Sequence, residues 1–166
     1  HYPAGEYDPA ETLAAFNELY KQGTVENIGV SNFTPALLEE AQRYSETDIA
    51  VNQIEFHPLL QDVETVERLT DSGVTVVAHT PLARMDITDL KELRRLSREL
   101  NLTVPQLTLA WITDFEGVVA IPKTSKRKHL LENLEADSFS LPPWATERVQ
   151  AINLQKRLND PDWGPW

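Results

Sequence analysis

Four short runs rich in apolar residues, each followed by a pattern typical of a helix, constrain the fold of this chain more than any other feature. The runs cover residues 27–30, 49–56, 74–78 and 118–121, and each contains β-branched Val or Ile. Strands of this kind that alternate with helices are typical of a parallel sheet covered by helices. The sequence therefore predicts an α/β fold with four parallel strands in chain order, joined by right-handed crossovers.

The helices between these runs are predicted from apolar spacing and from cap residues. Thr34 can cap a helix that begins at Pro35 and buries Leu37, Leu38, Ala41 and Tyr44, and Thr103 can cap another. Trp111 is expected in the core. The other predicted helices cover residues 10–22, 62–71, 88–100, 104–114, 125–134 and 145–155. Residues 159–166, with Trp163 and Trp166, are predicted to form a loop.

Composition narrows the class of protein. A chain of 166 residues with 41% hydrophobic content can bury one sizeable core, so one domain, 1–166, is expected. A net charge of −11 argues against non-specific binding to nucleic acid or to a membrane surface. The chain has no cysteine, no His spacing typical of a metal site, and no apolar run near the ~20 residues that span a bilayer. A soluble cytoplasmic protein is expected.

Polar residues follow each predicted strand. The carboxyl ends of parallel strands meet at one edge of a sheet, and ligands bind at that edge in barrels and open sheets alike. The residues predicted to lie there are Ser31, Asn32, Gln53, His79, Thr80, Lys123 and Thr124.

A basic segment follows the last strand. Four of the fifteen Lys and Arg residues fall between Lys123 and Lys128. Cations in the first turn of a helix oppose the helix dipole, and a bound anion such as phosphate would remove the conflict. A solvated basic turn in an acidic protein is the alternative, and the segment alone does not decide between them.

The sequence resembles the aldo-keto reductases, a family that uses a (β/α)8 barrel to transfer hydride from a nicotinamide cofactor to a carbonyl. Five motifs carry the resemblance because they occur in order and at the right spacing. They are Ile28-Gly29-Val30-Ser31-Asn32-Phe33, Val51-Asn52-Gln53-Ile54-Glu55-Phe56-His57-Pro58, Ala78-His79-Thr80-Pro81-Leu82, Ile121-Pro122-Lys123-Thr124 and Glu132-Asn133.

The resemblance implies that the chain is the C-terminal half of such a barrel, because a complete (β/α)8 barrel needs about 250 residues. The family takes its catalytic Asp, Tyr and Lys from the first four strands, and those strands have no counterpart here. His1-Tyr2-Pro3 matches the family's His-x-Pro segment, so His1 would be the one catalytic residue present. The chain begins with His and not Met, and we expect it to be cut from something longer and inactive alone.

The resemblance also assigns the nicotinamide end of a cofactor site. Ser31, Asn32 and Gln53 would hold the carboxamide, although Asn32 could equally be a turn or cap residue and Gln53 a satisfied polar residue. His79 stands where the family usually has an aromatic ring that stacks on the nicotinamide, or it could bond a loop carbonyl. The segment Thr80, Pro81 and Leu82 would face the pyrophosphate.

The adenosine end is assigned to the last strand and the helix after it. Lys123 and Thr124, in one motif with Ile121, would reach the 2′-phosphate, and Glu132 and Asn133 would meet the adenine, although both could be exposed helix residues. His129 stands where NADP-preferring members have an Arg. A neutral His cannot clamp a phosphate as Arg does, so NADP or NAD is expected with weak discrimination.

Two further interpretations stay open. The chain could be a non-catalytic nucleotide- or phosphate-binding half-barrel, alone or as a subunit, or part of an ordinary enzyme. The expected partners are a small carbonyl substrate and either the N-terminal half of the barrel or a second copy. An open half-barrel exposes the flanks of its outer strands, which favours association.

Overall fold

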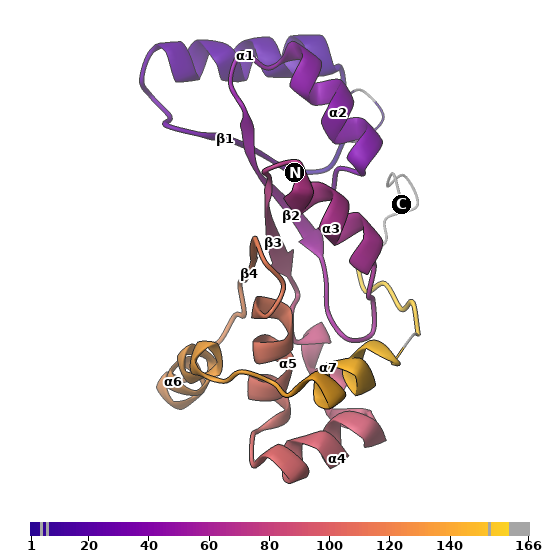
Figure 1. Cartoon of the computed structure of the whole chain (residues 1–166). Coiled ribbons are helices and arrows are strands. Elements are labelled where there is room, and N and C mark those ends of the chain that lie inside the picture. Colours follow the sequence, from indigo (N-terminus) through magenta and orange to yellow (C-terminus); the bar gives the residue numbers. More distant parts are fainter. Residues whose placement is uncertain (4, 6, 153, 160–166) are drawn as a thin grey trace. The chain divides into compact units, whose positions relative to one another are not determined.

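The computed structural model describes residues 1–3, 5, 7–152 and 154–159 (Figure 1). Contacts divide the chain into two compact units. Unit 1 comprises His1–Ile54, Val63–Val77 and the chain from Asn159, and unit 2 comprises Glu55–Asp62 and Ala78–Leu158. Each unit buries apolar side chains of its own, among them Leu13 and Leu69 in unit 1 and Trp111 in unit 2. The single domain expected from the sequence stays a prediction.

Four strands form a parallel sheet in the order β1-β2-β3-β4. They are β1 (Ile28–Ser31), β2 (Ile49–Glu55), β3 (Thr75–His79) and β4 (Val118–Ala120). Gly29 pairs with Val51 and Ser31 with Gln53, after a register shift between Ile28 and Gly29. A Cβ on Gly29 would lie 3.2 Å from the Val51 Cβ, so glycine permits this close approach. The prediction of an α/β fold with parallel strands in chain order is confirmed.

Unit 1 contains three helices, α1 (Pro9–Lys21), α2 (Pro35–Tyr44) and α3 (Val63–Asp71). Asp8 caps α1 and Thr34 caps α2, as their side chains accept backbone N–H groups of Glu11 and Leu37 at 3.0 and 3.3 Å. The Thr34 cap is confirmed. Each of these two helices has a proline in its first turn, where the absent N–H is not needed.

The packing of α1 and α2 differs from the prediction at one end. Tyr44 was expected to be buried and is exposed, whereas Leu38 and Ala41 are buried. A polar residue, Asn17, is buried instead: its Nδ2 donates to the Tyr44 carbonyl and its Oδ1 accepts from Glu46 N–H, both at 2.9 Å. The end of α2 is thus held by hydrogen bonds to its backbone, while the Tyr44 side chain is exposed.

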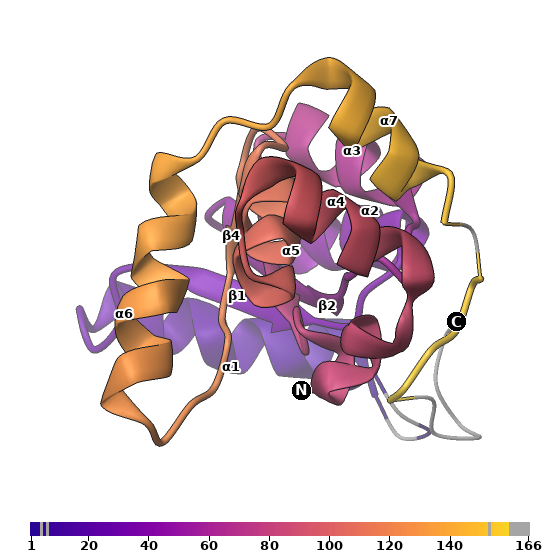
Figure 2. The same cartoon turned by 90° about the horizontal axis from the view of Figure 1, so that it is seen from below.

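Unit 2 contains α4 (Lys91–Leu100), α5 (Val104–Thr113), α6 (Arg127–Glu135) and α7 (Pro143–Gln150), with 3-10 segments η1 (Ala83–Asp89) and η2 (Ala136–Ser138). Thr103 caps α5 through a reciprocal capping box with Gln106, which confirms the predicted cap. Helix α7 lies against α4 (Figure 2), and Arg148 of α7 bonds Glu99 of α4 at 2.8 Å. Trp111 is fully buried and stacks on Phe56 with ring centroids 5.1 Å apart, as expected of a core residue.

Three predicted helix bounds are wrong for local reasons. The helix predicted at 88–100 begins at Lys91, because Leu90 is extended (ψ 117°) after η1. The helix predicted at 125–134 begins at Arg127, because Lys126 is extended and Thr124 Oγ1 accepts its N–H at 3.1 Å. The helix predicted at 145–155 is Pro143–Gln150, and Gln155 has a positive φ of 48° that no α-helix accommodates.

Within the described residues, no helix is long and apolar enough to cross a bilayer. Trp163 and Trp166 lie outside the residues that the structure describes.

Candidate functional site

In unit 1, the end of β1 brings together four of the predicted site residues. Ser31 Oγ donates to the Gln53 carbonyl at 2.9 Å, and Asn32 N–H donates to the same oxygen at 2.8 Å. Asn32 Nδ2 donates to the His1 carbonyl and to Ser31 Oγ, each at 3.1 Å. His1, Ser31, Asn32 and Gln53 thus form one hydrogen-bonded group.

Asn32 has an unusual conformation in this group. Its φ is +62°, in the left-handed region that Asn tolerates better than most residues, and its side chain is 1% exposed. The left-handed turn directs the backbone N–H back to β2 and the amide toward Ser31 and His1. The turn role that the sequence left open for Asn32 is therefore present, together with a buried amide.

Gln53 and His1 differ from Asn32 in how they are held. No hydrogen bond links the half-buried amide of Gln53 to another described residue, so its donors and acceptor are not committed within the described chain. The His1 ring is exposed and packs edge-on against Tyr2, with centroids 5.3 Å apart. His1 and Ser31 also line a cavity of about 270 Å³ beside α1.

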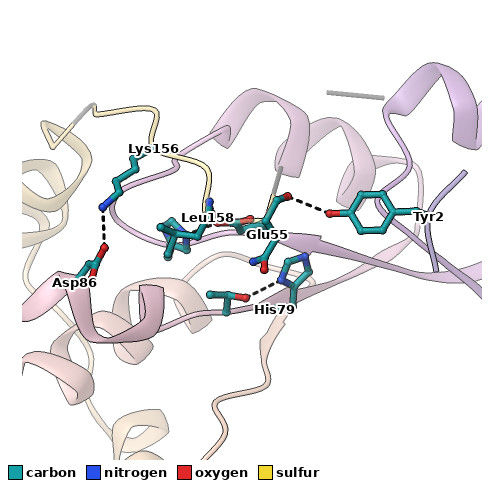
Figure 3. Close-up of polar contacts among 9 residues, drawn as sticks. Tyr2, Glu55, His79, Asp86, Lys156 and Leu158 are labelled. Carbon is teal, nitrogen blue, oxygen red and sulfur yellow. Dashed lines mark hydrogen bonds and ion pairs between the residues drawn. The ribbon is translucent and has the colours of Figure 1, made fainter. Parts of the chain in front are cut away.

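In unit 2, His79 ends β3 and contacts Thr80. His79 Nδ1 lies 3.0 Å from Thr80 Oγ1, and Thr80 has a positive φ of 54° (Figure 3). Burial is the largest cause that lowers the pKa of the His79 imidazole below its usual value. The Glu55 carboxylate opposes the shift, whereas the neighbouring His57 and the positive charge of Arg157 add to it. The imidazole is therefore neutral at pH 7.

The segment after Thr80 turns back on itself twice. Ala83 N–H donates to the Thr80 carbonyl at 2.8 Å and Met85 N–H to the Leu82 carbonyl at 2.7 Å. Ala83, Arg84 and Met85 all have φ between 45 and 76°, a region that disfavours residues with a Cβ. Pro81 and Leu82 are held in place by these turns, directly after His79.

The predicted phosphate residues lie on an open surface of unit 2. Lys123 and His129 are exposed, and Thr124 is half-buried. Lys126 is the N-cap residue of α6 and makes no side-chain cap bond, so Arg127, Lys128 and His129 form the first turn of the helix. Glu132 pairs with Lys128 at 3.6 Å. Ile121, Lys123 and Asn133 line a cavity of about 680 Å³ between β4 and α6.

One polar pair was not among the predicted site residues. Glu55 and His57 are both buried, and Glu55 Oε1 lies 2.8 Å from His57 Nε2. His57 is thus a buried histidine just after β2 that contacts the last residue of that strand. The available signal was their i, i+2 spacing, which places two ionisable side chains on one side of an extended chain. No group of three or more His, Cys, Asp or Glu residues in the described part could hold a metal ion.

Parallel strands that alternate with helices and end in polar residues are the arrangement of an α/β fold. The Aldo/keto reductase family profile matches residues 1–154. The chain belongs to the aldo/keto reductase family.

Two relatives and one solved structure illustrate the match. The chain is 34% identical to glyoxal reductase of Bacillus subtilis, over 98% of this chain and 58% of the relative. It is 32% identical to the NADPH-dependent D-xylose reductase of Candida boidinii, over 92% of this chain and 52% of the relative. The aldo-keto reductase Tm1743, crystallised with the inhibitor epalrestat, superposes with a TM-score of 0.86 at 34% identity, over 92% of this chain and 58% of that structure's chain. The chain thus spans about half to three-fifths of these proteins.

Proposed function

We propose that this chain supplies the cofactor-binding C-terminal half of an NAD(P)H-dependent reductase that converts aldehydes or ketones to alcohols. The observation that carries the proposal is the hydrogen-bonded group at the end of β1 and β2 in unit 1. It combines an oriented amide and hydroxyl with the uncommitted amide of Gln53. Such a set suits a planar carboxamide, which needs both donors and acceptors.

The directions of these hydrogen bonds determine which side-chain atoms would donate to a bound ligand and which would accept from it. Both Asn32 Nδ2 hydrogens are used, on His1 and Ser31, and the Ser31 hydroxyl hydrogen is used on Gln53. A ligand amide would therefore meet Ser31 Oγ as an acceptor for its NH₂ group. The Gln53 side-chain NH₂ would donate to the carboxamide oxygen.

In unit 2, a neutral His79 suits a stacking role. An uncharged imidazole offers its flat face to a nicotinamide without repelling the positive charge of the oxidised ring. Thr80, Pro81 and Leu82 would face the pyrophosphate, because their turns place backbone groups directly after His79.

The adenosine end would use the exposed cations of unit 2. Lys123 and Thr124 would meet the 2′-phosphate, with Ile121 beside them, and Glu132 and Asn133 the adenine. His129 in place of an arginine supports weak discrimination between NADP and NAD. Relatives are named as NADPH-dependent or as NAD(P)H-dependent, and the latter include several yeast xylose reductases.

The bound cofactor would supply a hydride, and this chain's residues would hold and orient it. His1 would help to orient the substrate carbonyl, because its ring is exposed on the same segment whose carbonyl binds Asn32. The Asp, Tyr and Lys that complete the family's chemistry have no counterpart in this sequence. The substrate would be a small carbonyl compound, as the names of the glyoxal and methylglyoxal reductases indicate for those relatives.

The surface of β4 and α6 supports the assignment to part of a barrel. Val119 and Ile121 are each 46% exposed and Leu134 is 66% exposed, around the cavity between β4 and α6. Among the described residues, β4 is an outer strand of the sheet, beside β3. We propose that the N-terminal half of a barrel, or a second copy of the chain, covers this surface.

A titration with two ligands tests the cofactor site. Gln53→Ala should weaken binding of NADPH and leave binding of adenosine 2′,5′-bisphosphate unchanged, because only NADPH carries the carboxamide. Lys123→Ala should weaken both, and Lys91→Ala, an exposed lysine on α4, should change neither. Equal effects of Gln53→Ala on the two ligands would contradict the carboxamide role. The assignment to the C-terminal half is tested by the same titration after the chain is combined with the part of glyoxal reductase that it does not match.

The exposed basic segment favours one alternative, a non-catalytic nucleotide- or phosphate-binding half-barrel. In that case adenosine 2′,5′-bisphosphate should bind as tightly as NADPH, and Gln53→Ala should affect neither ligand.

A further inference from the structure

A short segment of unit 2, residues 154–158, runs along the end of β2 and is called the strap here (Figure 3). Lys156 N–H donates to the Leu59 carbonyl and Leu158 N–H donates to Glu55 Oε1, both at 2.7 Å. Leu158 lies in a bend, and none of residues 154–158 belongs to a strand. The strap therefore docks through two backbone N–H groups, one bonded to a backbone carbonyl and the other to a side-chain carboxylate.

Apolar packing contributes little over residues 154–156 of the strap, whereas Leu158 is half-buried. Leu154 is 57% exposed, Lys156 and Gln155 are exposed, and Gln155 has a positive φ of 48°. Lys156 Nζ also pairs with Asp86 at 2.7 Å, but both side chains are about half exposed and such pairs are weak. Hydrogen bonds must therefore hold the strap, and their burial decides their strength.

Glu55 is a buried ionisable anchor of the strap. It is 4% exposed, and the same oxygen, Oε1, accepts from Leu158 N–H and from His57 Nε2. His57 Nδ1 is buried and has no partner in the described part of the chain. An ionised Glu55 fixes the imidazole proton on Nε2 and leaves Nδ1 as a lone pair. A protonated Glu55 would move that proton to Nδ1 as a buried, unbonded N–H, which is less favourable.

We propose that Glu55 is a positioning residue whose buried carboxylate anchors the strap and thereby sets the surroundings of His79. His79 senses both Glu55 and Arg157, a strap residue, and the Arg157 charge lowers the pKa of the imidazole. A docked strap thus keeps the Arg157 charge near His79, which favours the neutral imidazole. The use of a neutral His79 in nicotinamide stacking rests on the proposed function, whereas the anchoring of the strap by Glu55 does not.

Amide hydrogen exchange of the complete chain, without cofactor, tests the anchoring. Glu55→Gln keeps the shape but removes the charge, so the Lys156 and Leu158 amides should exchange about 10- to 100-fold faster, the factor that corresponds to a charge-assisted hydrogen bond. Asp86→Asn is the matched control, because it removes the exposed carboxylate that holds the same strap. It should leave both amides nearly unchanged. Amides of α5, in the core of unit 2, should be unaffected by either variant.

The titration of His79 separates anchoring from a simple charge effect. If Glu55 acts only through its charge, Glu55→Gln removes a negative charge that raises the His79 pKa, and this pKa falls further. If the strap is released, His79 gains water and loses Arg157, and its pKa rises toward 6.5. We expect the rise.

A second variant acts from the strap side in case Glu55→Gln does not fold. Leu158→Pro removes the N–H donor and leaves the Glu55–His57 pair in place. It should accelerate exchange of the Lys156 amide and raise the His79 pKa in the same way. Unchanged strap exchange, equal acceleration in α5, an equal effect of Asp86→Asn, or a fall in the His79 pKa would each overturn the proposal. None of these results depends on cofactor binding, so they leave the proposed function to its own test.

Discussion

Replacement of His129 with arginine tests the phosphate end of the proposed cofactor site. His129 is exposed in the first turn of α6, and the cap residue Lys126 makes no side-chain cap bond. Backbone N–H groups at such a helix start attract anions, and a guanidinium adds a permanent bidentate charge. We therefore expect His129→Arg to favour ligands that carry a 2′-phosphate.

The size of the effect follows from the surroundings of His129. A hydrogen bond between charged groups contributes about 1.5–3 kcal/mol when well ordered. The position is exposed, and Glu132 on the same helix, paired with Lys128 at 3.6 Å, offers the new arginine a competing partner. Both reduce the gain, to about 1–2 kcal/mol, or roughly 5- to 30-fold in the dissociation constant.

Isothermal titration at pH 8 with adenosine 2′,5′-bisphosphate and with 5′-AMP measures this gain. The bisphosphate should bind more tightly to His129→Arg, while 5′-AMP should be unchanged. Tyr44→Arg is the control, because it adds the same charge at an exposed position of α2, in unit 1. Equal tightening of both ligands, no tightening, or the same gain from Tyr44→Arg would show that His129 does not face a 2′-phosphate.

Four further predictions concern stability, activity, pH and assembly. Asn32→Ala should lower the free energy of unfolding by about 2–4 kcal/mol in urea, because it removes two buried hydrogen bonds and strains a positive φ. Asn32→Gly should cost less, and an equal loss would refute the conformational part. The 166-residue chain should not oxidise NADPH with glyoxal above background, because a positioned proton donor worth roughly 10²–10⁴ in rate is absent. His79 should titrate below 6.5 by NMR, so its contribution to stability is complete above pH 6.5 and is lost as pH falls through the lowered pKa. His79→Gln should flatten that dependence, and an unchanged slope would exclude His79 as its source. Leu134→Glu should weaken self-association in sedimentation, and no change would exclude the β4–α6 surface from the contact.

Local sequence signals predicted the strands and several helix starts. Thr34 and Thr103 were predictable as caps because each is a hydroxyl residue followed within two positions by a proline. This pattern is typical of a helix start, since the hydroxyl accepts a free backbone N–H and the proline lacks one. Burial on α2 was less predictable. Tyr44 lies at an apolar position of the helical pattern but is exposed. Asn17, a polar residue of α1, is buried and bonds the backbone at the end of that helix. A polar residue that bonds a distant carbonyl carries no periodic signal.

The candidate site was predicted by resemblance more than by pattern. The motifs named Ser31, Asn32 and Gln53, and the structure places these three within one hydrogen-bonded group of unit 1. The direction of each bond could not be predicted, because it depends on the left-handed turn at Asn32 and on the position of His1. Positive φ at Thr80 and Ala83 was equally hidden, since neither is a residue type that signals it.

Glu55 shows why the partners of some buried polar residues cannot be predicted from the sequence. A carboxylate at the end of an apolar strand should signal a partner, because an unpaired buried charge is costly. One partner, His57, lies two residues away, but the other is a backbone N–H 103 residues further along the chain. Backbone donors have no residue type, so no pattern could identify Leu158. A buried acidic residue in a strand therefore predicts that some donor docks there, and only the fold shows that the donor belongs to the strap.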